Sequence, residues 1–247
     1  MTSLSLFCWN IANPSTERVE KQFKWLRKQP SDIFLLTETK NSEGCKLLEK
    51  LFYAYGYNTI FPKPFDNEYG VMIASKHNIK VGNFSKGINF INSRISSCEV
   101  LIGDIPIEII VTYIPSRDSS ELKIERKRRF IDELKKAFLN YDKKNLVFCG
   151  DLNILEPNHV PHYSFFKQWE YDFYDFLINN NFVDSFRMLY PTELAYSWIG
   201  RTNDGYRYDH TFVSKNISSY IDGCYYNSEP VELKLSDHSA IISNLKF

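Results

Sequence analysis

The sequence predicts an α/β protein built as a sandwich of two β-sheets with helices on the outside. Short apolar runs of strand length recur along the chain, and longer segments with apolar residues three or four positions apart lie between them. Between Tyr57 and Tyr113, however, strand-like runs follow one another without a helical pattern, so strict alternation of strand and helix fails. Two packed sheets with outer helices accommodate both patterns.

The strands are expected where the runs are rich in Ile, Val, Leu and Phe, in residues 4–9, 33–36, 71–74, 107–113, 146–149 and 241–242. The helices are expected where charges alternate with apolar positions, in residues 16–28, 43–53, 120–139 and 166–179. The first of these follows Asn13-Pro14-Ser15, which is a helix start signal.

Length and charge set the broad class of protein. At 247 residues and 43% hydrophobic content the chain suits one large domain, 1–247, and no repeat or Pro/Gly/Ser-rich linker divides it. Thirty basic residues balance thirty acidic ones, which removes the inference that a strongly basic protein binds nucleic acid. A polyanionic partner must therefore meet a local basic patch, and binding that phosphates dominate should be sensitive to salt.

Cysteine usage and hydropathy indicate the compartment. The five cysteines are scattered singly, without the paired spacing of a zinc site or a disulfide framework, so we expect buried thiols in a reducing compartment. The N-terminal residues carry no basic leader, and no apolar stretch is long enough to span a bilayer. We expect a soluble, cytoplasmic protein with no membrane partner.

The informative polar residues lie at the ends of the predicted strands, where a sandwich brings them to one rim. They are Asn10, Glu38, Tyr113, the pair Asp151 and Asn153, the pair Asp237 and His238, and Asp209.

Mg²⁺ prefers oxygen ligands, and Glu38 with Asn10 or Asp237 could supply the few protein ligands that such an ion needs. In Gly150-Asp151-Leu152-Asn153 an acid and an amide follow a buried strand, so the acid could activate water while the amide holds an oxyanion. His238 is a candidate to stabilise charge on a phosphate, with Asp209 as its orienting partner.

Each fragment alone also has an ordinary structural explanation. A single Glu after a strand is more often a cap or a surface charge, and the Gly-Asp-x-Asn tetrapeptide is equally consistent with a plain turn. Ser236-Asp237-His238 could be a helix cap or a hydrogen-bonded loop. Their joint occurrence in one order favours the functional interpretation.

Taken in order, these fragments resemble the endonuclease/exonuclease/phosphatase superfamily, and within it the exodeoxyribonuclease III and AP endonuclease branch. The resemblance spans Leu6 to Ile242 and depends on Asn10, LLTETK, YGVMIASK, VTYIPS, GDLNI, FVDSFRMLYP, YSW, RYDHTFVS and SDHSAI. It implies a four-layer α/β sandwich. It also implies that Glu38 binds a divalent metal, Mg²⁺ with Mn²⁺ as the alternative ion, with Asn10 and Asp237 close to it.

The same resemblance implies the roles of the remaining polar residues. Asp151 would activate or orient the attacking water, and Asn153 would be the amide that holds the phosphate. Tyr113 would be the phenol that contacts the phosphate. His238 and Asp209 would be the paired imidazole and carboxylate beside the scissile bond.

Aromatic residues near the end of the chain bear on the substrate. In AP endonucleases a hydrophobic pocket accepts the flipped abasic sugar, and Trp198, Tyr206 and Tyr208 fall where its residues would lie. Period-two spacing places Tyr206 and Tyr208 on one strand face. The alternative is that these aromatics are ordinary core.

Three positions depart from the family pattern, namely Ala12, Thr37 and above all Ser116, where the repair enzymes usually carry Asn or Gln.

Basic residues near the rim are the candidates for DNA contact. Arg117 lies four residues beyond Tyr113, and Lys40 follows Glu38. The densest basic run, from Lys123 to Lys136, is expected instead to be a solvated helix face paired with neighbouring acids. His159 and His162 are expected to be surface loop residues.

The prediction for function is a Mg²⁺-dependent phosphodiesterase in base excision repair, an AP endonuclease and 3′-5′ exonuclease. It cuts duplex DNA 5′ to an abasic site and leaves a 3′-hydroxyl, and 3′-exonuclease or 3′-phosphatase action on 3′-end lesions is the expected second activity. We expect a monomer. The alternatives are another phosphoesterase of the superfamily, such as a tyrosyl-DNA phosphodiesterase, a deadenylase or a phosphatase, and a catalytically inactive binding module. The complete set of polar residues argues against the last of these.

Overall fold

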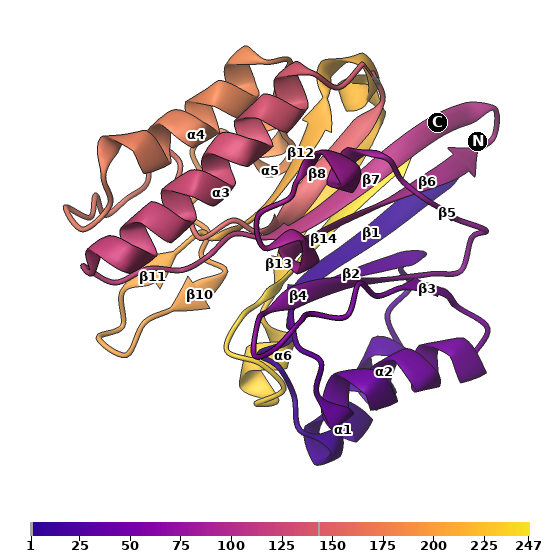
Figure 1. Ribbon diagram of the computed structural model, residues 1–247. Helices are drawn as coiled ribbons and strands as arrows, with labels where there is room; N and C mark the ends of the chain where they lie inside the picture. Colours follow the sequence, from indigo (N-terminus) through magenta and orange to yellow (C-terminus); the bar gives the residue numbers. More distant parts are fainter. Residues whose placement is uncertain (1, 143) are drawn as a thin grey trace.

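The computed structural model describes residues 2–142 and 144–247 and has four layers (Figure 1). Two six-stranded β-sheets pack face to face, helices α1 and α2 cover one outer face, and helices α3 and α4 cover the other. The four-layer α/β sandwich that the sequence predicts is therefore confirmed.

The first sheet has the strand order β13-β14-β1-β2-β4-β3. Its strands are β1 (Ser3–Asn10), β2 (Ile33–Thr39), β3 (Asn58–Ile60), β4 (Gly70–Ser75), β13 (Ile221–Asn227) and β14 (Ala240–Lys246). Only the β1–β2 pair is parallel, so the sheet is mixed. The two ends of the chain meet just beyond the paired strands β1 and β14, where the backbone of Thr2 exchanges hydrogen bonds of 3.2 and 2.8 Å with Phe247.

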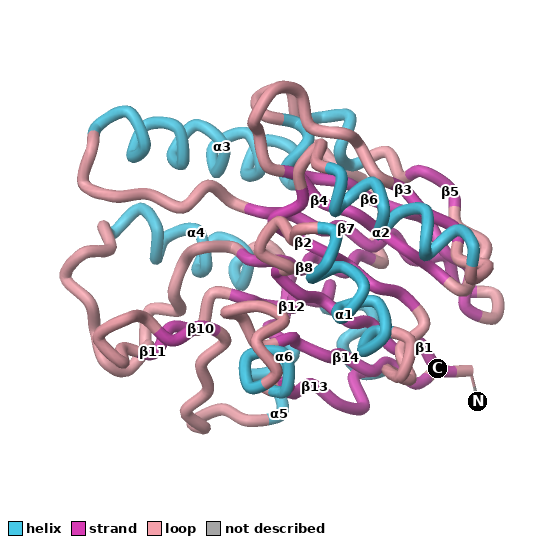
Figure 2. The backbone as a smooth tube through the Cα atoms, turned by 90° about the horizontal axis from the view of Figure 1, so that it is seen from below, coloured by secondary structure: helices cyan, strands magenta, loops and turns pink. Residues whose placement is uncertain are grey.

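The second sheet has the order β5-β6-β7-β8-β12-β9. Its strands are β5 (Lys80–Val81), β6 (Ile95–Ile102), β7 (Ile105–Tyr113), β8 (Leu146–Asp151), β9 (Phe182–Asp184) and β12 (Asp209–Ser214). A separate hairpin of β10 (Trp198–Ile199) and β11 (Gly205–Tyr206) extends away from the two large sheets (Figure 2).

The outer helices are α1 (Thr16–Leu26), α2 (Glu43–Ala54), α3 (Glu121–Leu139) and α4 (Gln168–Asn179), with short helices α5 (Ser185–Leu189) and α6 (Glu229–Glu232) and three 3₁₀ turns, η1 (Phe84–Gly87), η2 (Asn92–Arg94) and η3 (Lys215–Tyr220). The hydroxyl of Ser15 accepts a hydrogen bond from the backbone N–H of Arg18, which explains why α1 begins where the sequence places its cap. The hydroxyl of Ser42 caps α2 in the same way.

Period-two alternation distributes the apolar side chains between two kinds of core. In β1, Leu4, Leu6 and Cys8 point into the layer between the sheets, whereas Phe7 and Trp9 pack against α1 and α2. The same alternation holds across β2, β7 and β8. A side chain's parity in the strand therefore decides whether it faces the other sheet or a helix.

All the predicted strands and helices are present, but several elements were missed. The missed strands are short or polar, such as β12, which carries Asp209 and His210, and β6, which contains two serines. All five cysteines are buried free thiols, as expected. Among the described residues, no helix has the length and apolar character required to cross a membrane.

A buried ionic network holds Arg207, two residues before β12, against the segment around α5. Arg207 is completely buried and its Nη2 donates to Asp184 Oδ2 at 2.8 Å, while its Nε donates to Glu156 Oε1 at 3.1 Å. Asp184 also caps α5 and accepts a hydrogen bond from the Tyr174 hydroxyl. Burial alone would raise the pKa of Asp184, but the charge of Arg207 holds this pKa well below its usual range.

Replacing Asp184 with Asn (Asp184→Asn) should lower the free energy of unfolding by about 3 kcal/mol at neutral pH, because it leaves a buried guanidinium short of a partner. Since the folded-state pKa of Asp184 is depressed, its contribution is present above the ordinary pKa near 4 and is lost as the pH falls through the lower folded value. Urea unfolding at pH 7 and pH 3 tests this. The exposed Asp175→Asn is the control, and equal losses in the two variants would contradict the prediction.

Candidate active site

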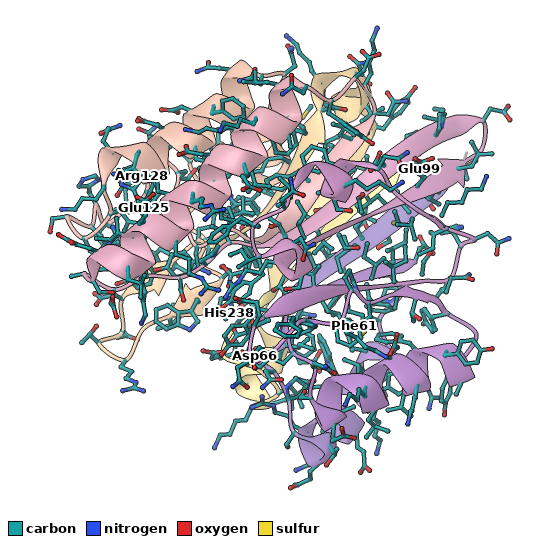
Figure 3. The ribbon with its side chains drawn as sticks, viewed as in Figure 1. Phe61, Asp66, Glu99, Glu125, Arg128 and His238 are labelled. Atoms are coloured by element: carbon teal, nitrogen blue, oxygen red, sulfur yellow. The ribbon has the colours of Figure 1, made fainter. Side chains whose placement is uncertain are left out.

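Most of the predicted site residues line one cavity between the two sheets, at the end where β1, β2, β7 and β8 finish. Its volume is about 340 Å³. Figure 3 places His238 in this region, between the half that carries α3 and α4 and the half that carries α1 and α2. The lining residues are Glu38, Tyr113, Ser116, Arg117, Lys127, Asp151, Asn153, Phe165, Phe166, Trp198, Tyr208, Asp237 and His238.

Strand register brings three of the functional side chains side by side. Tyr113 of β7 pairs with Asp151 of β8, which pairs in turn with Asp209 of β12. Each continues the series of residues that face the other sheet in its strand, so all three point into the interior. From the opposite sheet, Asn10 at the end of β1 donates its amide Nδ2–H to Asp151 Oδ2 at 2.8 Å.

Glu38 reaches the cavity only because β2 is irregular. Its neighbours of the same parity, Phe34 and Leu36, face the helices. The register with β4 shifts between Thr37 and Thr39, and Glu38 has a φ of 57°. Such a bulge re-aims a side chain. The carboxylate therefore lies beside Asn10 and Tyr113, whose hydrogen bonds partly offset the rise in its pKa that burial causes.

His238 and Asp209 form a tightly held pair. The Nδ1 atom of His238 lies 2.8 Å from Asp209 Oδ2, and its Nε2 lies 3.9 Å from Asp151 Oδ2. Burial of His238 disfavours its charge, but the carboxylate of Asp209 outweighs this effect and raises the pKa of His238 to about 9. The imidazole is therefore cationic at neutral pH and presents Nε2 towards Asp151.

Asp151 lies at the centre of the cavity floor and is almost completely buried. Its Oδ1 accepts a hydrogen bond of 3.0 Å from the backbone N–H of Asn153. Burial, together with the charge of Asp209, raises the pKa of Asp151 to about 7, although His238 and Asn10 act in the opposite direction. A carboxyl group with this pKa can exchange a proton near neutral pH, as a general base must.

The turn after β8 depends on two unusual backbone conformations. Gly150 has a φ of 148°, and a Cβ there would lie 1.8 Å from the carbonyl oxygen of Thr112, so only glycine fits. Asn153 adopts a φ of 48°, and its Nδ2 donates to the carbonyl oxygen of Ile114 at 3.0 Å. The amide nitrogen carries a second hydrogen that this bond does not use.

Tyr113 completes the floor of the cavity as a hydrogen-bond donor. Burial, reinforced by the nearby charges of Glu38 and Asp151, raises the pKa of Tyr113 well above its usual value. The phenol therefore keeps its proton throughout the physiological range, so it can donate to an anionic ligand.

The three residues predicted to bind metal occupy different environments. Glu38 lines the cavity, whereas Asp237 is exposed at its edge and accepts a hydrogen bond from Trp198 Nε1 at 2.9 Å. The amide oxygen of Asn10 accepts from the backbone N–H of Ala12 at 2.9 Å, so both ends of this amide are engaged. A separate group of possible ligand atoms, from Asp151, Asp209 and His238, lies within 4.8 Å.

The predicted aromatic residues lie together at one wall of the cavity. The ring centroids of Trp198 and Tyr208 are 5.9 Å apart, and Tyr206 stacks on Tyr208 at 5.1 Å. Trp198 and Tyr208 line the cavity, but Tyr206 does not, because it stacks on Tyr163 outside it.

The basic candidates differ in what they can reach. Lys40 lies over the ring of Tyr69 at 4.3 Å. Arg117, expected to contact DNA, lines the cavity with a side chain that is 2% exposed and that pairs with Glu170. The helix containing the basic run is not uniformly solvated either, because Lys127 is buried.

The two histidines of the loop after β8 also differ. His162 is exposed, as expected. His159 is buried, contrary to expectation. Its Nδ1 atom forms a hydrogen bond with the carbonyl oxygen of Pro161, and its Nε2 atom accepts a hydrogen bond from the backbone N–H of Arg207.

Sequence reasoning missed two residues that support the site. The hydroxyl of Ser197 accepts hydrogen bonds of 3.0 Å from the backbone N–H groups of Tyr208 and Asp209, which fixes the start of β12. The Nζ atom of Lys127 donates a hydrogen bond to the backbone carbonyl oxygen of Asn153. The sequence indicates that Lys127 is buried, because it lies three and seven residues before Phe130 and Leu134 on the apolar stripe of α3.

Comparisons with known proteins cover nearly the whole chain. The sequence profile described as the Endonuclease/Exonuclease/phosphatase family matches residues 8–238. An exodeoxyribonuclease of Bacillus subtilis is 24% identical over 96% of this chain and 98% of its own length. The DNA repair nuclease APEX1 of Danio rerio is 23% identical over 87% of this chain and 74% of its own length.

Solved structures share the fold. An AP endonuclease from Archaeoglobus fulgidus superposes with a TM-score of 0.82 at 22% identity, covering 99% of this chain and 100% of that one. The 3′ phosphatase NExo from Neisseria, bound to a product DNA hairpin, gives the same TM-score at 18% identity and the same coverage.

Removing the partner of His238 should lower its pKa. In Asp209→Asn the pKa should fall from about 9 towards its ordinary value near 6.5, because burial is then opposed only by the charges of Asp151 and Asp237. The stability that this pair contributes is fully present below the ordinary pKa and is lost as the pH rises through about 9. NMR titration of the metal-free protein measures this pKa, with the exposed Asp222→Asn as control. An unchanged pKa in Asp209→Asn would refute the assigned pairing.

Proposed function

This chain belongs to the Endonuclease/Exonuclease/phosphatase family, and we propose that it is a divalent-metal-dependent nuclease that cuts duplex DNA 5′ to an abasic site and leaves a 3′-hydroxyl. The observation that carries the proposal is the buried array of Asp151, His238 and Asp209 beside an aromatic wall in one cavity. The proposal includes action as a monomeric, single-domain enzyme over residues 1–247 in the cytoplasm, for which the sequence pattern is the support.

The protein side chains supply the base and the anion-binding groups. Asp151, with a pKa near 7, accepts the proton of the attacking water. The cationic His238, held by Asp209, lies next to it and stabilises the charge that develops on the phosphate. The phenol of Tyr113 and the free amide hydrogen of Asn153 can donate to phosphate oxygens from the same floor.

The donor set fits a hard divalent cation. Four carboxylates, from Glu38, Asp151, Asp209 and Asp237, surround a single imidazole, and the Oδ1 atom of Asp209 is buried without a hydrogen-bond partner. Burial raises the pKa of Glu38, so a bound cation would relieve a real electrostatic cost. Oxygen donors of this kind favour Mg²⁺ or Mn²⁺.

Glu38 would be the principal ligand, with Asp237 and the Asn10 amide oxygen nearby. When bound there, the ion supplies Lewis-acid stabilisation of the phosphate charge. The protein's own part is to hold these oxygens close together, through the bulge at Glu38 and the hydrogen bonds of Asn10.

A second cavity supports a nucleic-acid substrate. It has a volume of about 650 Å³ and shares Ser116 with the catalytic cavity. Lys123, Arg126 and Arg94 line it together with Asp66 and Glu68, and Phe65 in its lining is 89% exposed. Glu68 pairs with both arginines, so three cations face two acids. A strand that continues beyond the scissile phosphate would find a small excess of positive charge and an apolar surface here.

The aromatic wall supports the abasic site as the preferred lesion. A sugar that lacks a base leaves the helix at low cost, since no base pair must be broken. Trp198 and Tyr208 offer it an apolar surface within reach of His238, because Trp198 and His238 have ring centroids 6.3 Å apart. The similarity to a 3′ phosphatase favours action on 3′-end lesions as a second activity of the same site.

Conservative substitutions of the central groups should abolish turnover without unfolding the protein. Glu38→Gln, Asp151→Asn and His238→Asn should each lower kcat on the order of 1,000-fold, because each removes a charge that acts on the transition state. The measurement is cleavage of a labelled duplex with one tetrahydrofuran abasic analogue, in Mg²⁺ and in EDTA, with circular dichroism to check the fold.

An intact duplex and an RNA strand are the substrate controls. Cleavage of the RNA alone, or of neither DNA, would overturn the repair assignment. A wild-type rate in any of the three variants would remove the role assigned to that residue.

Trp198 should determine lesion selectivity more than chemistry. Trp198→Ala should reduce the preference for the abasic duplex over the intact one by about tenfold, since it removes an aromatic contact. Trp198→Phe keeps a ring but loses the hydrogen bond to Asp237, so it separates stacking from that bond. The exposed Tyr225→Ala serves as control. If Trp198→Ala keeps full selectivity, the aromatic wall does not recognise the sugar.

A further inference from the structure

Behind the catalytic cavity, two cations share one buried carboxylate. Glu170 of α4 is completely buried. Its carboxylate accepts two hydrogen bonds of 3.1 Å from Arg117 Nε and one of 2.5 Å from Lys127 Nζ. The side chains of Arg117 and Lys127 are only 2% and 1% exposed, yet both border the cavity.

The charges of this cluster do not cancel. Two cations against one carboxylate leave a net charge of about +1 within the cluster, beside a cavity that binds an anion in the proposed function, and the carboxylate of Asp151 across that cavity also acts on Lys127. Burial lowers the pKa of Lys127, but Glu170 opposes this effect. One cation would have sufficed to neutralise Glu170, so the second calls for another explanation.

Lys127 has a further contact that Arg117 lacks. Its Nζ donates to the backbone carbonyl oxygen of Asn153 at 2.5 Å. Asn153 is in the left-handed conformation, which glycine adopts freely and asparagine adopts more readily than other residues. Its backbone N–H is held by Asp151 and its side chain by the Ile114 carbonyl, so Lys127 supplies the third restraint, on the carbonyl side.

We propose that Lys127 is a positioning residue for phosphoester cleavage: from α3 it fixes the backbone of Asn153, and thereby the Asn153 amide that holds the phosphate. The inference rests on the proposed function for the role of Asn153. Position 127 belongs to the apolar stripe of α3, with Phe130, Ile131 and Leu134. An apolar residue there would pack without the desolvation that a buried lysine requires.

The variant Lys127→Met isolates this role. It keeps an unbranched side chain of similar length and leaves Arg117 and Glu170 as a balanced ion pair, so no buried charge loses its only partner. Lys127→Arg restores a donor and a charge. The matched control is Lys136→Met, the same change at an exposed lysine of the same helix.

A double-mutant cycle with Asn153→Ala distinguishes positioning from general support. Lys127→Met should lower kcat on the tetrahydrofuran duplex on the order of 100-fold, because a small displacement of a phosphate-holding group has a large effect on rate. In the Asn153→Ala background it should lower kcat less than about threefold, since the group that it positions is gone. Lys127→Arg should recover much of the rate, and Lys136→Met should match the wild type.

Equal losses from Lys127→Met in both backgrounds, or no loss in either, would overturn the inference. Parallel assays with the small diester bis(4-nitrophenyl) phosphate separate the inference about Lys127 from the proposed function. If the wild-type enzyme cleaves only this diester, the proposed DNA-repair function is wrong. The double-mutant cycle of Lys127→Met and Asn153→Ala can still be measured on this substrate.

An NMR measurement that does not depend on catalysis tests the inference when a variant is inactive. The side-chain amide signals of Asn153, identified by their loss in Asn153→Ala, should shift in the NMR spectrum of Lys127→Met and of Lys127→Arg in proportion to their loss of rate. They should not shift in Lys136→Met. Unshifted Asn153 signals in a folded Lys127→Met protein would overturn the inference whatever the activity.

Discussion

The hydrogen bond from Asn10 to Asp151 joins the two sheets at the point where the site forms, and the rest of the arrangement depends on it. Asn10 ends a strand of one sheet and Asp151 ends a strand of the other, so the bond fixes the separation of the sheets at that end. Because Asp151 is buried, it needs such partners to remain there. His238 and the Asn153 backbone then take their places around an already fixed carboxylate.

Departures from regular backbone geometry concentrate at this end of the sandwich. Glu38, Gly150 and Asn153 all have positive φ angles, and each lies at or just after the end of a strand that forms the cavity. Regular strands would deliver every second side chain to the interior, which suits Tyr113, Asp151 and Asp209 but not Glu38. The bulge in β2 adds Glu38 as a third carboxylic acid, and neighbouring hydrogen bonds stabilise the strained residues.

The sequence predicts most of the fold and the chemical groups of the site, but not which side chains pair with one another. Apolar runs predict the central strands because a buried strand must be apolar on both faces. The same reasoning overlooks β12 and, two residues before it, the buried Arg207, whose ion pairs with Asp184 and Glu156 no local pattern reveals. Arg117 illustrates the limit. Its place in a rim loop predicts a cation that contacts DNA. Its guanidinium, however, forms an ion pair with Glu170, which lies 53 residues away in the sequence.

The paired chain ends of the first sheet have a consequence for how this fold can be extended. β1 runs from Ser3 to Asn10 at the cavity, and β14 begins two residues after His238 and runs back to Lys246. At roughly 3.3 Å per residue the ends lie about 20 Å from the cavity, on the opposite side of the sandwich. A reporter, a surface tether or an additional module joined at either end would therefore leave the path of a long polymer across the cavity mouth open.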